Sequence, residues 1–268
     1  MNVVGEPVLE PRLTPVQREA FARDGYLVMR RIASAERVQN LRRIVADHLA
    51  RAVAPIEYEA DVAYPGAPAG RDAEGGDTPR RLRQAYDRDP AFAEWARDPR
   101  VTAIVAQLLD STDLRLTRCH HNCVMTKHPG YSSATLWHRD VRYWRFSSDN
   151  LVNAWLALGD ETPDNGCMWL LPGSHRLDVA PERLDEAQFL RDDLPANREL
   201  IATARSAPLE PGDVLFFHAA VFHAAGRNAT DIPKLSAVFT YHDAGNRPEP
   251  GSRSACQPAI DVATGEPA

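Results

Sequence analysis

The chain contains very little lysine. Of its 31 basic residues only Lys127 and Lys234 are lysines, and the remainder are arginines. The 37 acidic residues outnumber the basic ones, and the formal net charge is −6. Proteins whose main partner is a nucleic acid carry a concentrated basic face, so this balance argues against such a partner. In a chain that otherwise uses arginine, the two lysine positions are of special interest.

Cysteines and long apolar runs are also scarce. The four cysteines form no Cys-x-x-Cys pair, which favours reduced thiols in the cytoplasm. Residues 1–15 carry acids and prolines in place of an apolar core, so we expect no signal peptide. No run approaches the roughly 20 apolar residues that span a bilayer. The sequence predicts a cytoplasmic protein without a membrane partner and indicates no particular oligomeric state.

Helical patterns dominate residues 13–110. Thr14 and Pro15 are typical of a helix start, and we expect this helix to reach about Arg23. A short strand follows at residues 26–29, and Ser34 caps a second helix that runs to about residue 52. Residues 54–77, rich in Pro, Gly and acids, predict a long loop that is either a lid or disordered. A third helical stretch covers about residues 90–109.

Short apolar runs separated by turn residues fill residues 111–243. They predict strands at residues 114–125, 151–158, 167–171, 214–222 and 235–242. Because no helices alternate with these runs, the pattern favours an antiparallel sandwich or jelly roll. We therefore predict a single domain over residues 1–268, mainly β with helices (α+β). In it an N-terminal helical layer at 13–110 covers a jelly-roll core at 111–243, followed by a poorly ordered tail at 244–268.

The segment around His138 and Asp140 carries the clearest chemical signal. On a strand, residues two apart point to the same face, so this imidazole and carboxylate can converge on one point. A histidine from another strand would complete the 2-His-1-carboxylate set that holds Fe(II) and leaves coordination positions open. His218 and His223 are both candidates. They are five residues apart, so on a regular strand only one of them faces the iron, and strand parity does not decide which.

A nearby segment, Cys119-His120-His121-x-Cys123, superficially resembles a zinc cluster. Consecutive residues on a strand cannot all face one metal ion, which argues against that reading. His120 and His121 remain possible neighbours of the active-site cavity.

Five motifs in the same order resemble the phytanoyl-CoA dioxygenase family. They are His138-Arg139-Asp140, the segment 153–158, Asn165-Gly166-Cys167 with 171–175, the segment 211–218, and His223 with Asn228 and Lys234. The opening Phe21-x-x-Asp24-Gly25-Tyr26 matches as well. This resemblance implies a double-stranded β-helix of the cupin-like type and an oxygenase that depends on Fe(II), 2-oxoglutarate and O2.

The resemblance also implies roles for individual residues. The iron ligands fall on His138, Asp140 and His223, which leaves His218 as a core histidine or one that supports the site. Lys234 stands where the family has an arginine that anchors the distal carboxylate of 2-oxoglutarate. Lysine keeps the charge of that arginine but loses its two-pronged geometry. Ala225 replaces a serine that the family usually has beside this carboxylate.

Three further residues resemble cosubstrate positions. Asn122 and Thr126 match residues that bind 2-oxoglutarate in ectoine hydroxylases, and Trp155 matches a tryptophan near the cosubstrate. Two residues have alternative roles: Trp155 can be a core aromatic, and Lys234 a solvated cation at a strand end. Because related halogenases replace the carboxylate ligand by a small residue, Asp140 favours hydroxylation or another oxidation over halogenation.

The predicted function is therefore hydroxylation of an unactivated C–H bond in a small-molecule substrate, with release of succinate and CO2. Two alternatives remain open from the sequence. The first is a metal-binding jelly roll without catalytic activity, and the second is a cupin-type metalloenzyme that does not use 2-oxoglutarate. The identity of the primary substrate is not encoded in any motif.

Overall fold

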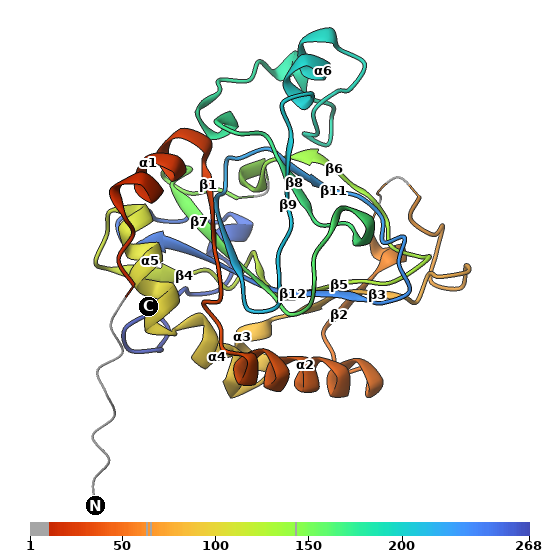
Figure 1. Cartoon of the computed structure of the whole chain (residues 1–268), viewed down its shortest axis with the longest axis horizontal. Coiled ribbons are helices and arrows are strands. Elements are labelled where there is room, and N and C mark those ends of the chain that lie inside the picture. Colours follow the sequence, from red (N-terminus) through yellow and green to blue (C-terminus); the bar gives the residue numbers. More distant parts are fainter. Residues whose placement is uncertain (1–10, 63, 65, 143) are drawn as a thin grey trace, which may run out of the picture.

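Two antiparallel sheets face each other, and helices cover the outer side of the larger one (Figure 1). The computed structural model describes residues 11–62, 64, 66–142 and 144–268. The larger sheet has the strand order β1-β10-β7-β12-β5-β3-β2, and β4 pairs with both β12 and β13. The smaller sheet has the order β6-β11-β8-β9. This arrangement confirms the predicted jelly roll with its N-terminal helical layer.

The bounds of the elements are as follows. The larger sheet contains β1 (Tyr26–Met29), β2 (Ile56–Tyr58), β3 (Pro79–Arg83), β4 (Leu114–Leu116), β5 (Asn122–Lys127), β7 (Leu151–Ala157), β10 (Val214–His218), β12 (Lys234–Asp243) and β13 (Ile260–Asp261). The smaller sheet contains β6 (Thr135–His138), β8 (Met168–Leu170), β9 (Arg205–Ala207) and β11 (His223–Ala225). The helices are α1 (Pro15–Asp24), α2 (Ala35–Ala50), α3 (Ala85–Arg88), α4 (Pro90–Ala96), α5 (Pro99–Leu109) and α6 (Pro195–Ile201).

The helix ends follow from local chemistry. The Thr14 side chain accepts a hydrogen bond from the backbone N–H of Gln17, and Gly25 closes α1 in the left-handed conformation. Ser34 caps α2 in the same way. The single helix expected over residues 90–109 is two helices, because Asp98 caps a new start and Pro99 cannot donate the hydrogen bond that would continue α4.

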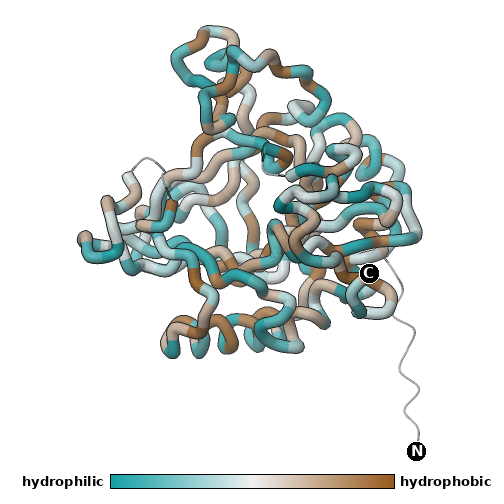
Figure 2. Tube along the Cα trace, turned by 180° about the vertical axis from the view of Figure 1, so that it is seen from behind, coloured by the Kyte–Doolittle hydropathy of each residue, from teal (hydrophilic) through white to brown (hydrophobic). Residues whose placement is uncertain are grey.

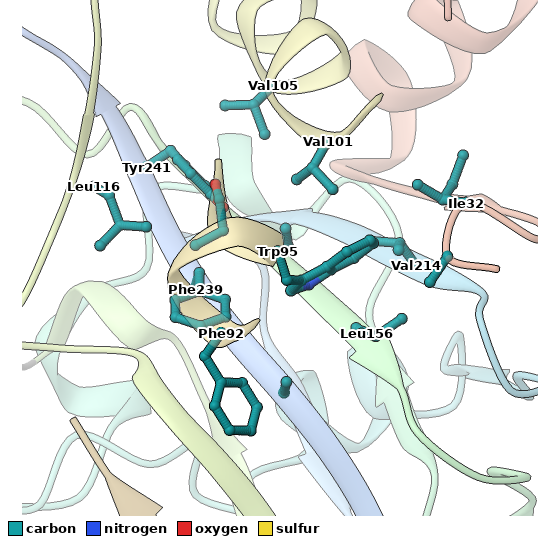
Figure 3. Close-up of a cluster of buried hydrophobic side chains, with 14 of the residues drawn as sticks. Ile32, Phe92, Trp95, Val101, Val105, Leu116, Leu156, Val214, Phe239 and Tyr241 are labelled. Carbon is teal, nitrogen blue, oxygen red and sulfur yellow. The ribbon is translucent and has the colours of Figure 1, made fainter. Parts of the chain in front are cut away.

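Strand alternation divides the core into two layers. On β7, Val152, Ala154 and Leu156 pack against the helical layer, whereas Trp155 and Ala157 face the smaller sheet. Figure 3 shows the helical layer meeting the larger sheet at Trp95, Phe92, Val101, Val105, Leu156, Val214, Phe239 and Tyr241. The hydropathy trace of α2 alternates between brown and teal along its turns, as expected for a helix with one buried side (Figure 2).

Several boundaries differ from the sequence prediction. The run at 114–125 is split into β4 and β5, and the run at 214–222 ends as a strand at His218. β2 lies inside the segment expected to be a loop, and the C-terminal segment returns to the larger sheet as β13. No described helix has the length and apolar character required to cross a membrane.

Candidate active site

A cavity of about 320 Å³ is lined by residues of both sheets. His138, Asp140 and His223 form part of its wall, and so do both lysines of the chain. Residues of β2 and β3, together with Glu59, Val62 and Tyr64, contribute the wall beside β5. The tertiary structure therefore brings the predicted metal ligands and the predicted cosubstrate anchor, Lys234, to one cavity.

The His138, Asp140 and His223 side chains converge on one point. Nε2 of His138 lies 3.9 Å from Asp140 Oδ1, and Nε2 of His223 lies 3.7 Å from the same oxygen. All three potential ligand atoms lie within 4.8 Å of one another, and all three residues are buried. Among the described residues this is the one group of three His, Cys, Asp or Glu side chains with such an arrangement.

The orientation of both imidazole rings fits a metal ion. His138 Nδ1 lies 2.8 Å from the carbonyl oxygen of Leu136, and His223 Nδ1 lies 3.0 Å from that of Val221. A carbonyl oxygen only accepts, so each Nδ1 carries the proton and each Nε2 lone pair is free to bind a cation. Burial lowers the pKa of both rings, that of His138 to about 3, which favours the neutral form that metals bind.

Hydrogen bonds fix the carboxylate ligand. Asn153 Nδ2 donates to Asp140 Oδ2 at 2.7 Å, and His121 Nε2 lies 3.0 Å from Asp140 Oδ1. Thr240 Oγ1 in turn donates to Asn153 Oδ1. Burial opposes ionisation of Asp140, but the charge and the hydrogen bond of His121 outweigh it and hold the pKa of this carboxyl well below its usual range. The donor set of two neutral imidazoles and one carboxylate is the one that suits Fe(II) with open positions.

His138 and Asp140 come together through a turn and not, as expected from the sequence, through a shared strand. β6 ends at His138, and Asp140 begins a short 3-10 helix, so the two do not share a strand as the sequence suggested. A turn brings Asp140 back, and its backbone N–H donates to the Ala219 carbonyl at 2.9 Å. Likewise, His218 and His223 lie on different strands of different sheets. Sheet membership, which strand parity could not reveal, separates the two histidines.

His218 lies away from the metal-ligand cluster. It ends β10, where its ring lies tilted against that of His175 with centroids 5.4 Å apart and its Nδ1 accepts a hydrogen bond from the backbone N–H of Ala220. His223 instead pairs directly with His138 in the smaller sheet, with ring centroids 4.2 Å apart.

Lys234 is buried and already has a carboxylate partner. Its Nζ lies 3.0 Å from Glu161 Oε2, and both side chains are almost inaccessible to solvent. Glu161 Oε1 accepts from Trp155 Nε1 at 2.8 Å and from Ser236 Oγ at 2.6 Å. Lys234 Nζ also lies 5.0 Å from the centroid of the Trp155 ring. Trp155 is a packed aromatic that also forms part of the cavity wall, and its role beside the cosubstrate stays a prediction.

Lys127 is a site residue to which the sequence assigned no role. It is the direct cross-strand neighbour of Lys234 in the β5–β12 pair, so both side chains lie on the same face of the sheet. Lys127 Nζ donates to the carbonyl oxygens of Ser133 at 3.0 Å and Gly226 at 2.5 Å. Burial lowers the pKa of Lys127 to about 7, and the charge of Lys234 is the next largest cause of this shift. In the sequence, the rarity of lysine was the signal that could have pointed to Lys127.

Gly166 allows the chain to pass close to Lys127. Its φ is +79°, and a Cβ at this position would come within 2.8 Å of Lys127 Cδ and 2.5 Å of the Gly226 carbonyl oxygen. The Asn165-Gly166 motif therefore shapes the wall around the lysine end of the cavity.

Asn122 and Thr126 border the cavity, but their side chains are engaged elsewhere. The register of β5 places them on the face opposite to Lys127, together with Val124, which packs against the helical layer. Asn122 Oδ1 accepts from the backbone N–H of Tyr86, and Thr126 Oγ1 donates to the Pro79 carbonyl at 2.6 Å. Strand parity therefore places these two side chains on the face opposite to Lys127 and Lys234, and their role in cosubstrate binding stays a prediction.

The mouth of the cavity is rich in arginine. Arg83 and Arg253 are exposed and have no ion-pair partner among the residues that the structure describes, whereas Arg118 pairs with Asp87 at 2.9 Å. His120 and His121 both border the cavity. The His120 ring stacks on Trp144 with centroids 4.8 Å apart and adds an aromatic wall to the mouth.

Comparisons with known proteins agree with this geometry. The ectoine dioxygenase of Sphingopyxis alaskensis is 26% identical over an alignment that covers 97% of this chain and 90% of that protein. The peroxisomal phytanoyl-CoA dioxygenase of Mus musculus is 26% identical over 231 residues, covering 81% of this chain and 65% of that protein.

Solved structures are similar as well. The epimerase SnoN, in complex with Fe3+, alpha-ketoglutarate and nogalamycin RO, superposes with a TM-score of 0.69 and is 27% identical, covering 88% of this chain and 85% of SnoN. The fold is shared with EctD from S. alaskensis, with a TM-score of 0.71 at 23% identity over 88% of this chain and 78% of EctD. Residues 21–236 match the family model described as phytanoyl-CoA dioxygenase (PhyH). The chain belongs to the phytanoyl-CoA dioxygenase family.

Proposed function

We propose that this protein is an Fe(II)- and 2-oxoglutarate-dependent dioxygenase that hydroxylates an unactivated C–H bond of a small molecule and releases succinate and CO2. The observation that carries the proposal is the convergence of the free Nε2 atoms of His138 and His223 with Asp140 Oδ1 in a cavity that also holds two lysines. The relatives and SnoN, which was solved with iron and alpha-ketoglutarate, support it.

His138, Asp140 and His223 would hold the iron. Bound iron, together with O2 and 2-oxoglutarate, supplies the oxidising chemistry that no side chain can provide. The protein fixes the donor atoms through the Leu136 and Val221 carbonyls and through Asn153. The buried walls keep bulk water away from the reacting groups. A complete carboxylate ligand at Asp140 favours hydroxylation over halogenation.

The lysine end of the cavity would bind the distal carboxylate of 2-oxoglutarate. Two lysine cations and the Glu161 carboxylate leave one net positive charge there, which matches one carboxylate. Because Glu161 already neutralises Lys234, Lys127 supplies the uncompensated charge. Trp155, whose indole N–H is held by Glu161, would form the side wall beside the cosubstrate. Asn122 and Thr126 have no part in this proposal because their side chains point to the other face of β5.

The mouth favours a primary substrate with an anionic group. Arg83 and Arg253 lie at the cavity rim without acidic partners among the described residues, so either can offer a cationic contact to a carboxylate or phosphate ester. A substrate screen should therefore compare anionic small molecules with neutral analogues. Arg83→Gln should raise KM for the anionic members, and Arg43→Gln on the exposed side of α2 is the matched control.

A cytoplasmic location is part of the proposal. All four cysteines are free in the structure, which suits a reducing compartment.

The decisive experiment measures metal and cosubstrate binding together with turnover. Anaerobic protein with Fe(II) should develop a visible metal-to-ligand absorption band when 2-oxoglutarate is added, and O2 should then yield succinate. Binding of Fe(II) without the absorption band would favour a metalloenzyme that does not use 2-oxoglutarate. Metal and 2-oxoglutarate binding without succinate, across the whole substrate screen, would favour a non-catalytic binding module.

A further inference from the structure

Two cysteines far apart in the sequence meet at the cavity mouth. Cys119 lies between β4 and β5, and Cys256 lies in the C-terminal segment, 137 residues later. Their Sγ atoms are 3.2 Å apart, and both residues border the cavity. Cys256 is exposed and Cys119 is half-buried, so an oxidant in solution can reach this pair, whereas Cys123 and Cys167 are buried.

The backbone on both sides of Cys256 is anchored to the segment that carries Cys119. Before it, Ser254 Oγ accepts from the backbone N–H of Arg145 at 2.9 Å and lies 2.7 Å from His120 Nε2. After it, Cys119 Sγ donates to the Gln257 carbonyl oxygen at 3.6 Å, and β13 pairs with β4. A disulfide has an S–S distance of about 2.05 Å, so the two sulfurs need to approach by only about 1 Å.

We propose that Cys119 and Cys256 form a reversible disulfide that fastens the C-terminal segment to the mouth of the cavity. With a low-molecular-weight disulfide such as oxidised glutathione as the oxidant, Cys256 attacks one glutathione sulfur. This step forms a mixed disulfide and releases the first glutathione thiol, which takes up the Cys256 proton. Cys119 then attacks Cys256 Sγ and releases the second glutathione thiol, which takes up the Cys119 proton. Two protein thiols are oxidised and one glutathione disulfide is reduced.

The order of the two steps follows from the surroundings of each thiol. The thiolate is the attacking form, and burial, followed by the contact with Cys256, raises the pKa of the Cys119 thiol to about 11. Cys119 is therefore a poor first nucleophile for an oxidant in solution. Cys256 is exposed and reacts first, and Cys119 resolves the mixed disulfide because its sulfur is already adjacent.

The bond would fix a part of the cavity wall. Arg253 and Gln257, on either side of Cys256, both border the cavity. Oxidation therefore adds a covalent bond to the hydrogen bonds and to the packing of Ile260 and Val262 that hold the reduced segment. Any effect on the KM of the primary substrate rests on the proposed dioxygenase function, but formation of the disulfide does not.

The test uses the full-length protein without iron, incubated with oxidised glutathione and then alkylated. The expected product is two hydrogens lighter than the reduced protein and has two alkylatable thiols in place of four. Tryptic digestion should link the peptide 119–127 to the peptide 254–268, and reduction should separate them. Because peptide 119–127 also contains Cys123, the Cys123→Ser variant serves as the control and should form the same link in the same yield.

Cys119→Ser and Cys256→Ser should each lose the link entirely. In Cys119→Ser the reaction should stop at a glutathione adduct on Cys256. A wild-type protein that ends with glutathione on Cys256 and an alkylated Cys119 would overturn the proposal, and so would a link that persists in Cys119→Ser. The mass measurement needs neither iron nor 2-oxoglutarate, so its outcome is independent of the proposed activity.

Discussion

The two ends of the cavity are built in different ways. At the metal end, three buried donor atoms face one another, and backbone carbonyls, the Asn153 amide and the His121 ring hold them in place. At the lysine end, the charge of Lys234 is already balanced by Glu161, and Lys127 adds one further cation. The metal end therefore depends on the position of each atom, whereas the lysine end depends on a count of charges. Loss of one ligand at the metal end should abolish iron binding. Loss of one residue at the lysine end should weaken stability or the affinity for 2-oxoglutarate by a measurable amount without abolishing it.

The largest effect is expected from His223→Ala. Loss of a ligand should abolish iron binding and succinate formation, beyond the roughly 10–100-fold loss that removal of a ligand's hydrogen-bond partner causes. His218→Ala is the matched control, because the His218 ring lies against His175 and does not belong to the group of His138, Asp140 and His223. Iron content after dialysis and succinate release measure both variants. Retained iron in His223→Ala with lost iron in His218→Ala would show that the wrong histidine has been assigned.

Glu161→Gln should show that the lysine end is governed by charge. Glutamine can still accept from Trp155 and Ser236, but Lys234 loses its buried counter-charge. We expect the free energy of unfolding in urea to fall by about 3–5 kcal/mol. Saturating 2-oxoglutarate should reduce the difference in unfolding free energy between Glu161→Gln and the wild type, because its carboxylate supplies a negative charge in place of Glu161.

Two control variants sharpen this prediction. The double variant Glu161→Gln/Lys234→Met should recover most of the lost stability, since it removes the Lys234 charge that Glu161→Gln leaves without a partner. Asp47→Asn, which breaks the exposed pair with Arg51, should change the stability by less than about 1 kcal/mol. If Glu161→Gln were as stable as the wild type, Lys234 would not need its counter-charge.

Lys127→Met should raise KM for 2-oxoglutarate by about 10–100-fold, with iron affinity unchanged. A hydrogen bond to a charged group contributes about 1.5–3 kcal/mol, and each 1.4 kcal/mol corresponds to about tenfold in affinity. Arg83→Gln, at the mouth, should leave this KM at the wild-type value. An unchanged KM in Lys127→Met would remove Lys127 from the cosubstrate site.

The smallest effect is a pH dependence of the affinity for 2-oxoglutarate, which arises at the lysine end and not at the metal end. Burial lowers the pKa of Lys127 to about 7, so the protonated fraction in the free protein falls as the pH rises through 7. Carboxylate binding requires the protonated form, and the affinity for 2-oxoglutarate should therefore weaken by up to about tenfold per pH unit above 7. Lys127→Met should show a flat profile over the same range. A slope that persists in this variant would point to another titrating group.

The sequence predicted the class of fold and the region of the site for a local reason. Period-two runs and turn residues encode strands one at a time, and the predicted runs at 151–158, 167–171 and 235–242 became β7, β8 and β12 with end shifts of a residue or so. The same local logic was insufficient at Asp140, where a turn replaces the expected strand, and at 214–222, where the chain leaves one sheet and enters the other.

Sequence by itself therefore determined the jelly roll, its helical layer and the neighbourhood of His138, Asp140 and His223, because helix caps, strand periodicity and ordered motifs are written in adjacent residues. Only the tertiary structure decided which side chains that are distant in the sequence lie next to one another. The β5–β12 register places Lys127 beside Lys234, and a loop 73 residues earlier brings Glu161 to neutralise it. The same is true of Cys119 and Cys256. Such pairs follow from strand register and chain closure, which no local pattern of residue types specifies.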